Sequence, residues 1–436
     1  MTSLLEAENG VPTIAVHTHV FHRVAKSTAR LRGIPNLRQA FVPQPVVGRT
    51  PGELRAYIEG DDAISGRKFM EEVIEGLTRP LDDADLSGAT FERTTPRLVP
   101  ADTQENLETL FLENRWTDYM PVVLPTEERV AAMLKATSQS ADKVVGRMRA
   151  GNFRESWEYT VEKVAVNAVM AGARPEYFPV ILALAASNQT SRQGSTTSQT
   201  CFSVVNGPVR NKLGMNAGIG AMGPYNHANT TIGRAYSLLS QNGQGGSVPG
   251  ETYMGAHGNP LAYSLCFPEN EERSPWVPLH VQKGFKPTDS TVSVFVGNRG
   301  IQEGFGPRDT WEAKFRRCLT ATSHIPPCVI VDPIVARLFV ARGIKSKDDL
   351  INWCARNARV TARDYWDDQW IQTLVRPRAV AGVEPYATRL KAAPDDIIEM
   401  YEASQINAVV VGGETQGAFK IFSAHYVTTV SVDAWR

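Results

Sequence analysis

The sequence lacks the features that mark several large classes of protein. It has no CxxC pair, and its five cysteines are odd in number and widely spaced. This spacing argues against a zinc knuckle or a thioredoxin-like motif and favours free thiols in a reducing compartment. No apolar run approaches the roughly 20 residues of a membrane span, and the first residues lack the charged and apolar regions of a signal peptide. We therefore expect a cytoplasmic protein with no membrane partner.

An excess of charge of either sign is also missing. Lys and Arg total 46, as do Asp and Glu, so the formal net charge is zero. This balance provides no electrostatic reason to expect a nucleic acid as a partner. It also provides little repulsion between copies of the chain, and we expect a homo-oligomer. With 436 residues, of which 42% are hydrophobic, the chain is long enough for two or three globular domains.

The composition changes along the chain and divides it into three regions. Residues 1–100 are rich in Pro and Gly, which predicts an irregular N-terminal arm that wraps the body or another subunit. Within this arm we expect a strand near Thr13–Val20 and a helix near Gly66–Leu77. Residues 101–300 form a main domain that contains a Gly- and Asn-rich active site. Residues 301–436 form a second α/β lobe.

Strand patterns alternate with helical patterns, which predicts an α/β or mixed α+β fold in two lobes. Thr126 and Thr160 each precede a helical pattern as N-caps, and Pro175 opens the next helix of a predicted hairpin. The stretches VVNGPVRNKLG and VIVDPIVARLF share a strand–turn–helix form. They indicate either a diverged internal duplication or a coincidence of common turn residues. Near the C-terminus, we expect a helix over PDDIIEMYEAS and then a strand over INAVVV.

The densest polar signal lies between residues 206 and 276. The run ANTTIGRA predicts a helix start capped by Asn229 or Thr230, where free N–H groups and Arg234 bind an anionic substrate. There is no Walker A loop or clean GxGxxG, so no nucleotide is implied. The alternative is a Gly-rich structural loop with an ordinary helix cap. The other candidate substrate-binding residues are Asn206, Asn216, Asn226, Glu251, Lys163 and Glu414.

The candidate catalytic residues lie mainly in CFPENEERSPW. Glu269, Glu271 and Glu272 are three carboxylates in four residues, suited to acid–base chemistry or to a divalent metal. A solvated charged turn is the other interpretation. Cys266 is a candidate nucleophile or redox centre, or else a buried small hydrophobic residue. His227 is a candidate general base or ligand, with a structural hydrogen bond as the alternative.

Long stretches of this chain also resemble the large domain associated with the UGSC-type (seleno)protein family, whose members carry a Sec-Gly-Ser-Cys or Cys-Gly-Ser-Cys module. The resemblance covers roughly residues 105–300, with a weaker similarity in VVVGGETQG. This sequence has no C-G-S-C motif, which puts an implied redox role in doubt. The resemblance also implies an Arg where this chain has His227. The stretches that carry it are TDYMPVVLPTEERVAAML, TVEKVAVNAVMAGARPEYFPVILAL, VVNGPVRNKLGMNAGIGAMGPYNHANTTIGRA, PGETYMGAHGNP and CFPENEERSPWVPLHVQKGFKPTDSTVSVF.

Together these patterns predict an enzyme that acts on a small polar, anionic substrate by hydrolytic or eliminative bond cleavage. Cys266, His227 or a glutamate among residues 269–272 would perform the nucleophilic or acid–base work. One alternative is a thiol-redox component that works with a separate small Cys/Sec protein of the UGSC type. The others are a metal-dependent enzyme with a divalent ion and a non-catalytic assembly subunit.

Overall fold

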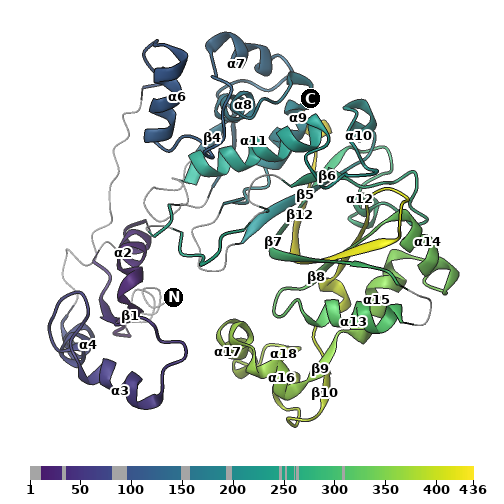
Figure 1. Cartoon of the computed structure of the whole chain (residues 1–436). Helices are drawn as coiled ribbons and strands as arrows, with labels where there is room; N and C mark the ends of the chain where they lie inside the picture. The colour runs from purple at the N-terminus through teal and green to yellow at the C-terminus, as the bar shows by residue number, and fades with distance from the viewer. Residues whose placement is uncertain are drawn as a thin grey trace.

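The chain folds around one curved sheet with helices packed on its outer side (Figure 1). The mixed α/β fold predicted from the sequence is confirmed. No helix in the part described is long and apolar enough to cross a membrane. The computed structural model describes residues 11–31, 36–80, 96–148, 158–192, 199–244, 248–250, 253–259, 261, 265–306 and 310–436.

The main sheet has six strands in the order β11-β8-β12-β7-β5-β6. β5 is parallel to β6 and β8 is parallel to β11, whereas the other neighbouring pairs are antiparallel. The two outermost strands approach each other, since the N–H of Asn270 donates to the carbonyl of Val410 at 2.8 Å. The strand bounds are β5 (Thr200–Asn206), β6 (Cys266–Pro268), β7 (Thr291–Gly304), β8 (Pro327–Val331), β11 (Asn407–Val410) and β12 (Ala418–Ser431).

The sheet has two halves that repeat one topology. The first half consists of β7, β5 and β6, and the second half of β12, β8 and β11. β7 and β12 have 14 residues each and pair antiparallel, so that Thr291 faces Ser431 and Gly304 faces Ala418. β5 pairs with β7 from Asn206 opposite Thr291, and β8 pairs with β12 so that Asp332 lies beside Ala418. Each of these strands leads into a helix, α10 (Val209–Lys212) or α14 (Pro333–Ala341). The two predicted strand–turn–helix units therefore occupy equivalent places, as an internal duplication requires.

Side chains alternate between the two faces of the sheet. Val205, Val292 and Val294 face α8 (Val161–Met170), α9 (Phe178–Ala185) and α11 (His227–Gln244), within one large apolar core. In the second half, Val331 and Ile421 face α13 (Trp311–Thr320), α14 and α15 (Lys347–Asn357). The opposite face carries a third core, which the curved sheet encloses. That inner core includes Phe202, Val204, Phe267, Phe295, Ile330, Val409 and Phe422.

Most predicted helices are present with their predicted caps. Thr126 and Thr160 accept hydrogen bonds from the third N–H of α7 (Glu127–Leu134) and α8, respectively. Pro175 opens η2 (Pro175–Tyr177), which continues into α9.

The helix predicted over PDDIIEMYEAS is wrong. Asp396 closes a turn by accepting the N–H of Ala393, and the β-branched residues that follow form β10 (Ile397–Glu399). β10 pairs antiparallel with β9 (Arg359–Thr361), so a tertiary partner overrides the helical pattern.

The described residues between 11 and 80 contain more regular secondary structure than the irregular arm predicted for residues 1–100. The expected strand is β1 (Ala15–Thr18), which pairs in parallel with β2 (Gln39–Val42), and the expected helix is α4 (Phe69–Thr78). This N-terminal unit lies apart from the main sheet in Figure 1. It also contains η1 (His19–Phe21), α2 (His22–Leu31) and α3 (Pro51–Glu59).

The other elements lie between those already described or at the C-terminus. They are α6 (Gln104–Glu113), β3 (Val144–Arg147), β4 (Glu158–Thr160), α12 (Leu279–Gln282), α16 (Ala362–Asp367), η4 (Ile371–Val375), α17 (Arg376–Val380), α18 (Tyr386–Leu390), η5 (Ala403–Gln405) and η6 (Asp433–Trp435).

Candidate functional site

The predicted acidic residues and Asn206 meet just beyond β6. The carboxylate of Glu269 is completely buried and accepts hydrogen bonds on both oxygens. Lys347 Nζ lies 2.5 Å from Oε1, and the N–H of Val410 lies 3.4 Å from the same atom. Asn206 Nδ2 and the N–H of Leu279 each lie 2.7 Å from Oε2. The four donors come from both halves of the sheet. This carboxylate therefore stabilises the contact between the halves and is not available as a base.

The other two glutamates are held by a buried guanidinium on α10. Arg210 Nε lies 2.9 Å from Glu271 Oε1, which also accepts the N–H of Gly207. A second Arg210 nitrogen lies 2.9 Å from Glu272 Oε1. The hydrogen bond from Arg210 is the main reason that the pKa of Glu272 falls to about 2. Glu272 therefore remains an anion at neutral pH, unsuited to donating a proton.

Glu414 occupies the corresponding place after β11. It binds Arg337 of α14 at 2.6 Å and Arg273 of the first half at 3.2 Å. The hydrogen bond from Arg337 lowers the pKa of this carboxyl. In each half, an arginine on the helix that follows β5 or β8 thus binds a glutamate that follows the outermost strand, β6 or β11.

The predicted Asn residues stabilise the Gly-rich loop. The predicted cap position is wrong, because α11 begins at His227 and Asn226 accepts the N–H of Asn229. Asn229 Nδ2 donates to the carbonyls of Asn216 and Ala221. The side chain of Asn216 in turn bonds to the backbone of Gly218 and Ile219, and the N–H of Thr230 donates to Asn226 O. These contacts match the structural-loop alternative.

Arg234 is paired within the protein. Its Nε and a terminal nitrogen lie 2.9 and 3.0 Å from the two carboxylate oxygens of Asp118, whose side chain is completely buried. The same terminal nitrogen donates to Pro121 O at 2.7 Å. A guanidinium with these partners is not free to bind a substrate anion.

Three further candidates lie away from the acidic residues. His227 is exposed at the start of α11, with its ring 5.8 Å from that of Tyr177. Lys163 is exposed on α8. Glu251 lies outside the described residues, so the structure does not place it.

All five thiols are buried and reduced. Burial raises the pKa of Cys201, Cys266 and Cys328 to about 12 and also raises the pKa of Cys318 and Cys354. A thiol of this kind is almost fully protonated at neutral pH, whereas the thiolate is the nucleophile. The geometry therefore favours Cys266 as a small hydrophobic residue of the core.

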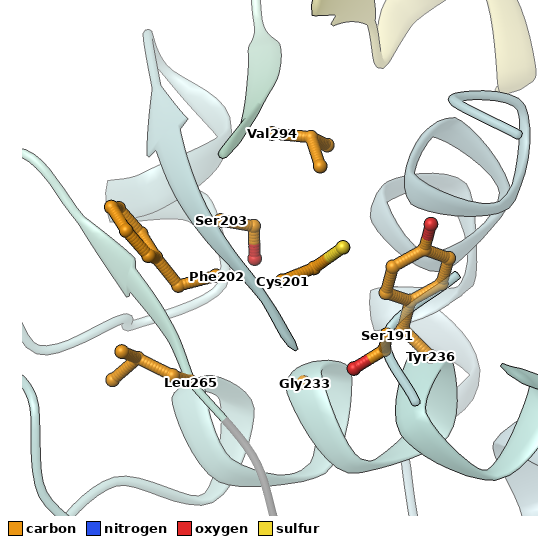
Figure 2. A pocket seen from close by; sticks show the side chains of 8 residues that line it. All are labelled: Ser191, Cys201, Phe202, Ser203, Gly233, Tyr236, Leu265 and Val294. Carbon is orange, nitrogen blue, oxygen red and sulfur yellow. The ribbon is translucent and has the colours of Figure 1, made fainter. Parts of the chain in front are cut away.

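A small enclosed cavity lies between β5 and α11 (Figure 2). Its volume is about 10 Å³, enough for one water molecule at most. In Figure 2, the Cys201 sulfur points toward the ring of Tyr236 across this space. The cavity is too small for a substrate. Its lining consists of Ser191, Cys201, Phe202, Ser203, Gly233, Tyr236, Leu265 and Val294.

The side chains that the structure describes do not form a metal site. Within the described ranges, no three His, Cys, Asp or Glu side chains lie close enough together to hold a metal ion. Glu269, Glu271 and Glu272 lie within four residues of sequence, but Lys347 and Arg210 bind their oxygens. The predicted acidic residues therefore do not form a ligand set.

A lysine that the sequence analysis did not select lies near the buried ion pair. Lys283 follows α12, and its Nζ lies 2.7 Å from Asn407 Oδ1 and 4.1 Å from the ring centre of Tyr426. In the described part of the chain, no carboxylate lies within ion-pair distance of this ammonium. Burial lowers the pKa of Lys283, and the charge of Lys347 lowers it further. In the sequence, the one feature that marks Lys283 is its position before Gly284, which indicates a helix end but no function.

Hydroxyl groups continue from this lysine along the inner face of the sheet. Tyr426 Oη lies 2.9 Å from Thr429 Oγ1, which lies 2.8 Å from Ser293 Oγ. Thr429 and Ser293 are directly opposite each other on β12 and β7. The three groups form a continuous hydrogen-bonded chain beside Lys283.

Several buried polar atoms in the same region have no hydrogen-bond partner among the described residues. They are Asn206 Oδ1, Thr291 Oγ1 and both ring nitrogens of His280. Asn206 and Thr291 face each other across β5 and β7, and His280 follows Leu279, whose N–H binds Glu269. Leaving such an atom unsatisfied costs about 1–3 kcal/mol, so native proteins keep few of them outside functional regions. We call Asn206, Glu269, His280, Lys283, Thr291 and Lys347 the inner polar cluster.

Comparison with known proteins supports an association with the UGSC family. The family model matches residues 3–64, which include β1, α2, β2 and α3. This match lies N-terminal to residues 105–300, over which the sequence predicted the resemblance, and the matched segment has no cysteine. Neither the curated proteins nor the solved structures include a match.

Proposed function

We propose that this protein is an enzyme that acts on a small polar, anionic substrate at the inner polar cluster, by hydrolytic or eliminative bond cleavage. The observation that carries the proposal is Lys283. It is a partly buried lysine, without a carboxylate partner in the described ranges, beside a buried ion pair and a chain of hydroxyl groups. Lysines of lowered pKa serve as bases or as cationic anchors in enzymes.

The asymmetry between the two halves supports this location. Where the first half has Asn206 with an unsatisfied oxygen, the second half has Asp332, whose carboxylate is fully engaged by the N–H groups of Val335 and Ala418. The buried polar Thr291 corresponds to Ala418 in the second half. The second half of the sheet is thus built, among the described residues, with no unsatisfied polar atom at these two positions, so folding alone does not require the unpaired atoms Asn206 Oδ1 and Thr291 Oγ1. A binding or catalytic role explains why they are present.

Lys283 can serve both reaction types through one proton transfer. In an elimination, its neutral amine accepts a proton from a substrate carbon while the leaving group departs with its bonding electrons. In a hydrolysis, the amine accepts a proton from the attacking water. In both reactions the resulting ammonium stays beside the substrate. Its positive charge stabilises the negative charge that develops there.

The observed geometry favours this role over the thiol and metal alternatives. The thiols are buried with raised pKa values, and the glutamates are occupied by Arg210 and Lys347. A non-catalytic assembly subunit is the remaining competitor, and it predicts no ligand at the inner polar cluster.

Ligand binding tests the proposal directly. Acetate, malonate, pyruvate and inorganic phosphate would each be added to the protein while its Tm is measured. We expect at least one of them to raise the Tm of the wild type and of Lys286→Met, an exposed lysine nearby that serves as the control. The same anion should not raise the Tm of Lys283→Met. No stabilisation of the wild type would contradict an anionic substrate, and stabilisation that survives Lys283→Met would contradict this site.

The lowered pKa of Lys283 has a separate chemical test. Reductive methylation with labelled formaldehyde modifies neutral amines, so the reaction of each lysine follows its own titration. Peptide mass spectrometry should show Lys283 reaching half-maximal modification at a lower pH than Lys286. Equal pH profiles would remove the reason for assigning the base to Lys283.

A further inference from the structure

The balanced net charge of the chain hides two oppositely charged segments. Residues 11–52 contain six Arg or Lys and no Asp or Glu, whereas residues 98–114 contain four acidic residues and no Arg or Lys. The basic segment includes α2, and the acidic segment includes α6. The basic residues are Arg23, Lys26, Arg30, Arg32, Arg38 and Arg49, and the acidic residues are Asp102, Glu105, Glu108 and Glu113.

Helix α2 displays part of the basic charge on its surface. Arg23 and Lys26 are three residues apart, so they lie on the same side of the helix, and both are exposed. Ala25 and Ala29 are buried on a different side, toward the N-terminal unit. The cationic side of α2 is therefore directed away from its own core.

A groove of about 430 Å³ runs along α6. Its apolar lining includes Val99, Pro100, Leu107 and Leu110. Asp102 and Glu113 also line it. A mainly apolar groove that also contains acidic residues suits an amphipathic basic helix, whose aliphatic side-chain stems cover the apolar lining while its cations meet the carboxylates.

We infer that this groove binds helix α2 of a second copy of the chain. Figure 1 shows α2 and α6 of one chain well separated, so the groove is not filled by the helix of its own chain. Because each copy carries both the basic helix and the acidic groove, two copies exchange two equal contacts and form a closed dimer. The attraction between these charges weakens in salt, with a screening length of about 8 Å at physiological ionic strength.

Charge reversal on each side of the contact tests the inference with the full chain. In Arg23→Glu/Lys26→Glu, an acidic helix meets an acidic groove, and in Asp102→Lys/Glu113→Lys, a basic helix meets a basic groove. Sedimentation velocity should show a wild-type dimer and should show both variants as monomers, with dissociation constants raised about 100-fold or more. An equimolar mixture of the two variants should form dimers again, since each helix then meets a groove of opposite charge.

The controls make each outcome decisive. Arg55→Glu/Lys135→Glu has the same change in net charge as the first variant, at exposed positions elsewhere, and should remain a dimer. Circular dichroism should show all variants folded. A monomeric wild type, dimers that persist in both variants, or a mixture that stays monomeric would each overturn the inference.

Discussion

Lys347 and Glu269 form a buried ion pair that joins the two halves of the sheet. Lys347 is the first residue of α15 in the second half, and Glu269 follows β6 in the first, with 2.5 Å between Nζ and Oε1. Their side chains are 1% and 0% exposed. Removing two charges from water is unfavourable unless further hydrogen bonds compensate, and Glu269 has three other donors.

This relationship predicts a large and unequal effect of removing either partner. Glu269→Leu leaves the Lys347 ammonium buried without its counterion, and we expect the free energy of unfolding to fall by about 3–5 kcal/mol. Lys347→Met should cost less, because three donors still bind Glu269. The double variant should recover part of the loss caused by Glu269→Leu. Urea unfolding measures all three, and a loss below about 1 kcal/mol for Glu269→Leu would show that the pair is not buried as described.

Because the thiols are buried, we expect them to react slowly with thiol reagents. In the native protein at pH 8, we expect none of the five cysteines to react rapidly with Ellman's reagent, because burial keeps them protonated and out of reach. All five should react once urea unfolds the chain. Rapid modification of native Cys266, identified by peptide mass spectrometry, would instead restore the thiol-based functions.

The Arg210–Glu272 pair predicts a dependence of stability on acid pH. The pKa of Glu272 is about 2 in the folded protein and about 4.5 when unperturbed, so its contribution is complete above pH 4.5. That contribution decreases as the pH falls toward 2. The Glu272 side chain is 53% exposed, so solvent screening limits the effect to about 1 kcal/mol. Urea unfolding between pH 6 and pH 3 should show a shallower loss of stability for Glu272→Gln than for Glu128→Gln, an exposed control on α7.

Local patterns in the sequence predicted much of the architecture. Thr126 and Thr160 were recognisable as caps because a threonine before acidic first-turn residues satisfies free N–H groups. The shared form of VVNGP and VIVDP indicated equivalent strand ends, and the sheet places Asn206 and Asp332 at equivalent positions. The long strands β7 and β12 were not predicted. Their pairing joins residues more than a hundred positions apart, which short-range periodicity does not reveal.

The candidate site was only partly predictable. Asn206, Glu269 and Glu271 were each selected as candidates from the sequence, but their contact with one another was not predicted. Their roles also depend on Arg210 and Lys347, which no local motif identified. Burial and charge pairing are properties of the folded chain. For the same reason, a lysine with a lowered pKa cannot be distinguished in sequence from an exposed one.

The pairing of Arg234 with Asp118 gives a last prediction, which separates structure from substrate binding. Asp118→Asn removes the buried carboxylate charge, and Arg234→Met removes its partner, so each should lower the free energy of unfolding by about 3 kcal/mol. In a double-mutant cycle the two losses should be far from additive, because either change breaks the same contact. Both variants should still gain the Tm increase that small anions give to the wild type. If Arg234→Met abolishes that increase and Asp118→Asn does not, then Arg234 binds the substrate anion after all, and the site lies at the start of α11 rather than at the inner polar cluster.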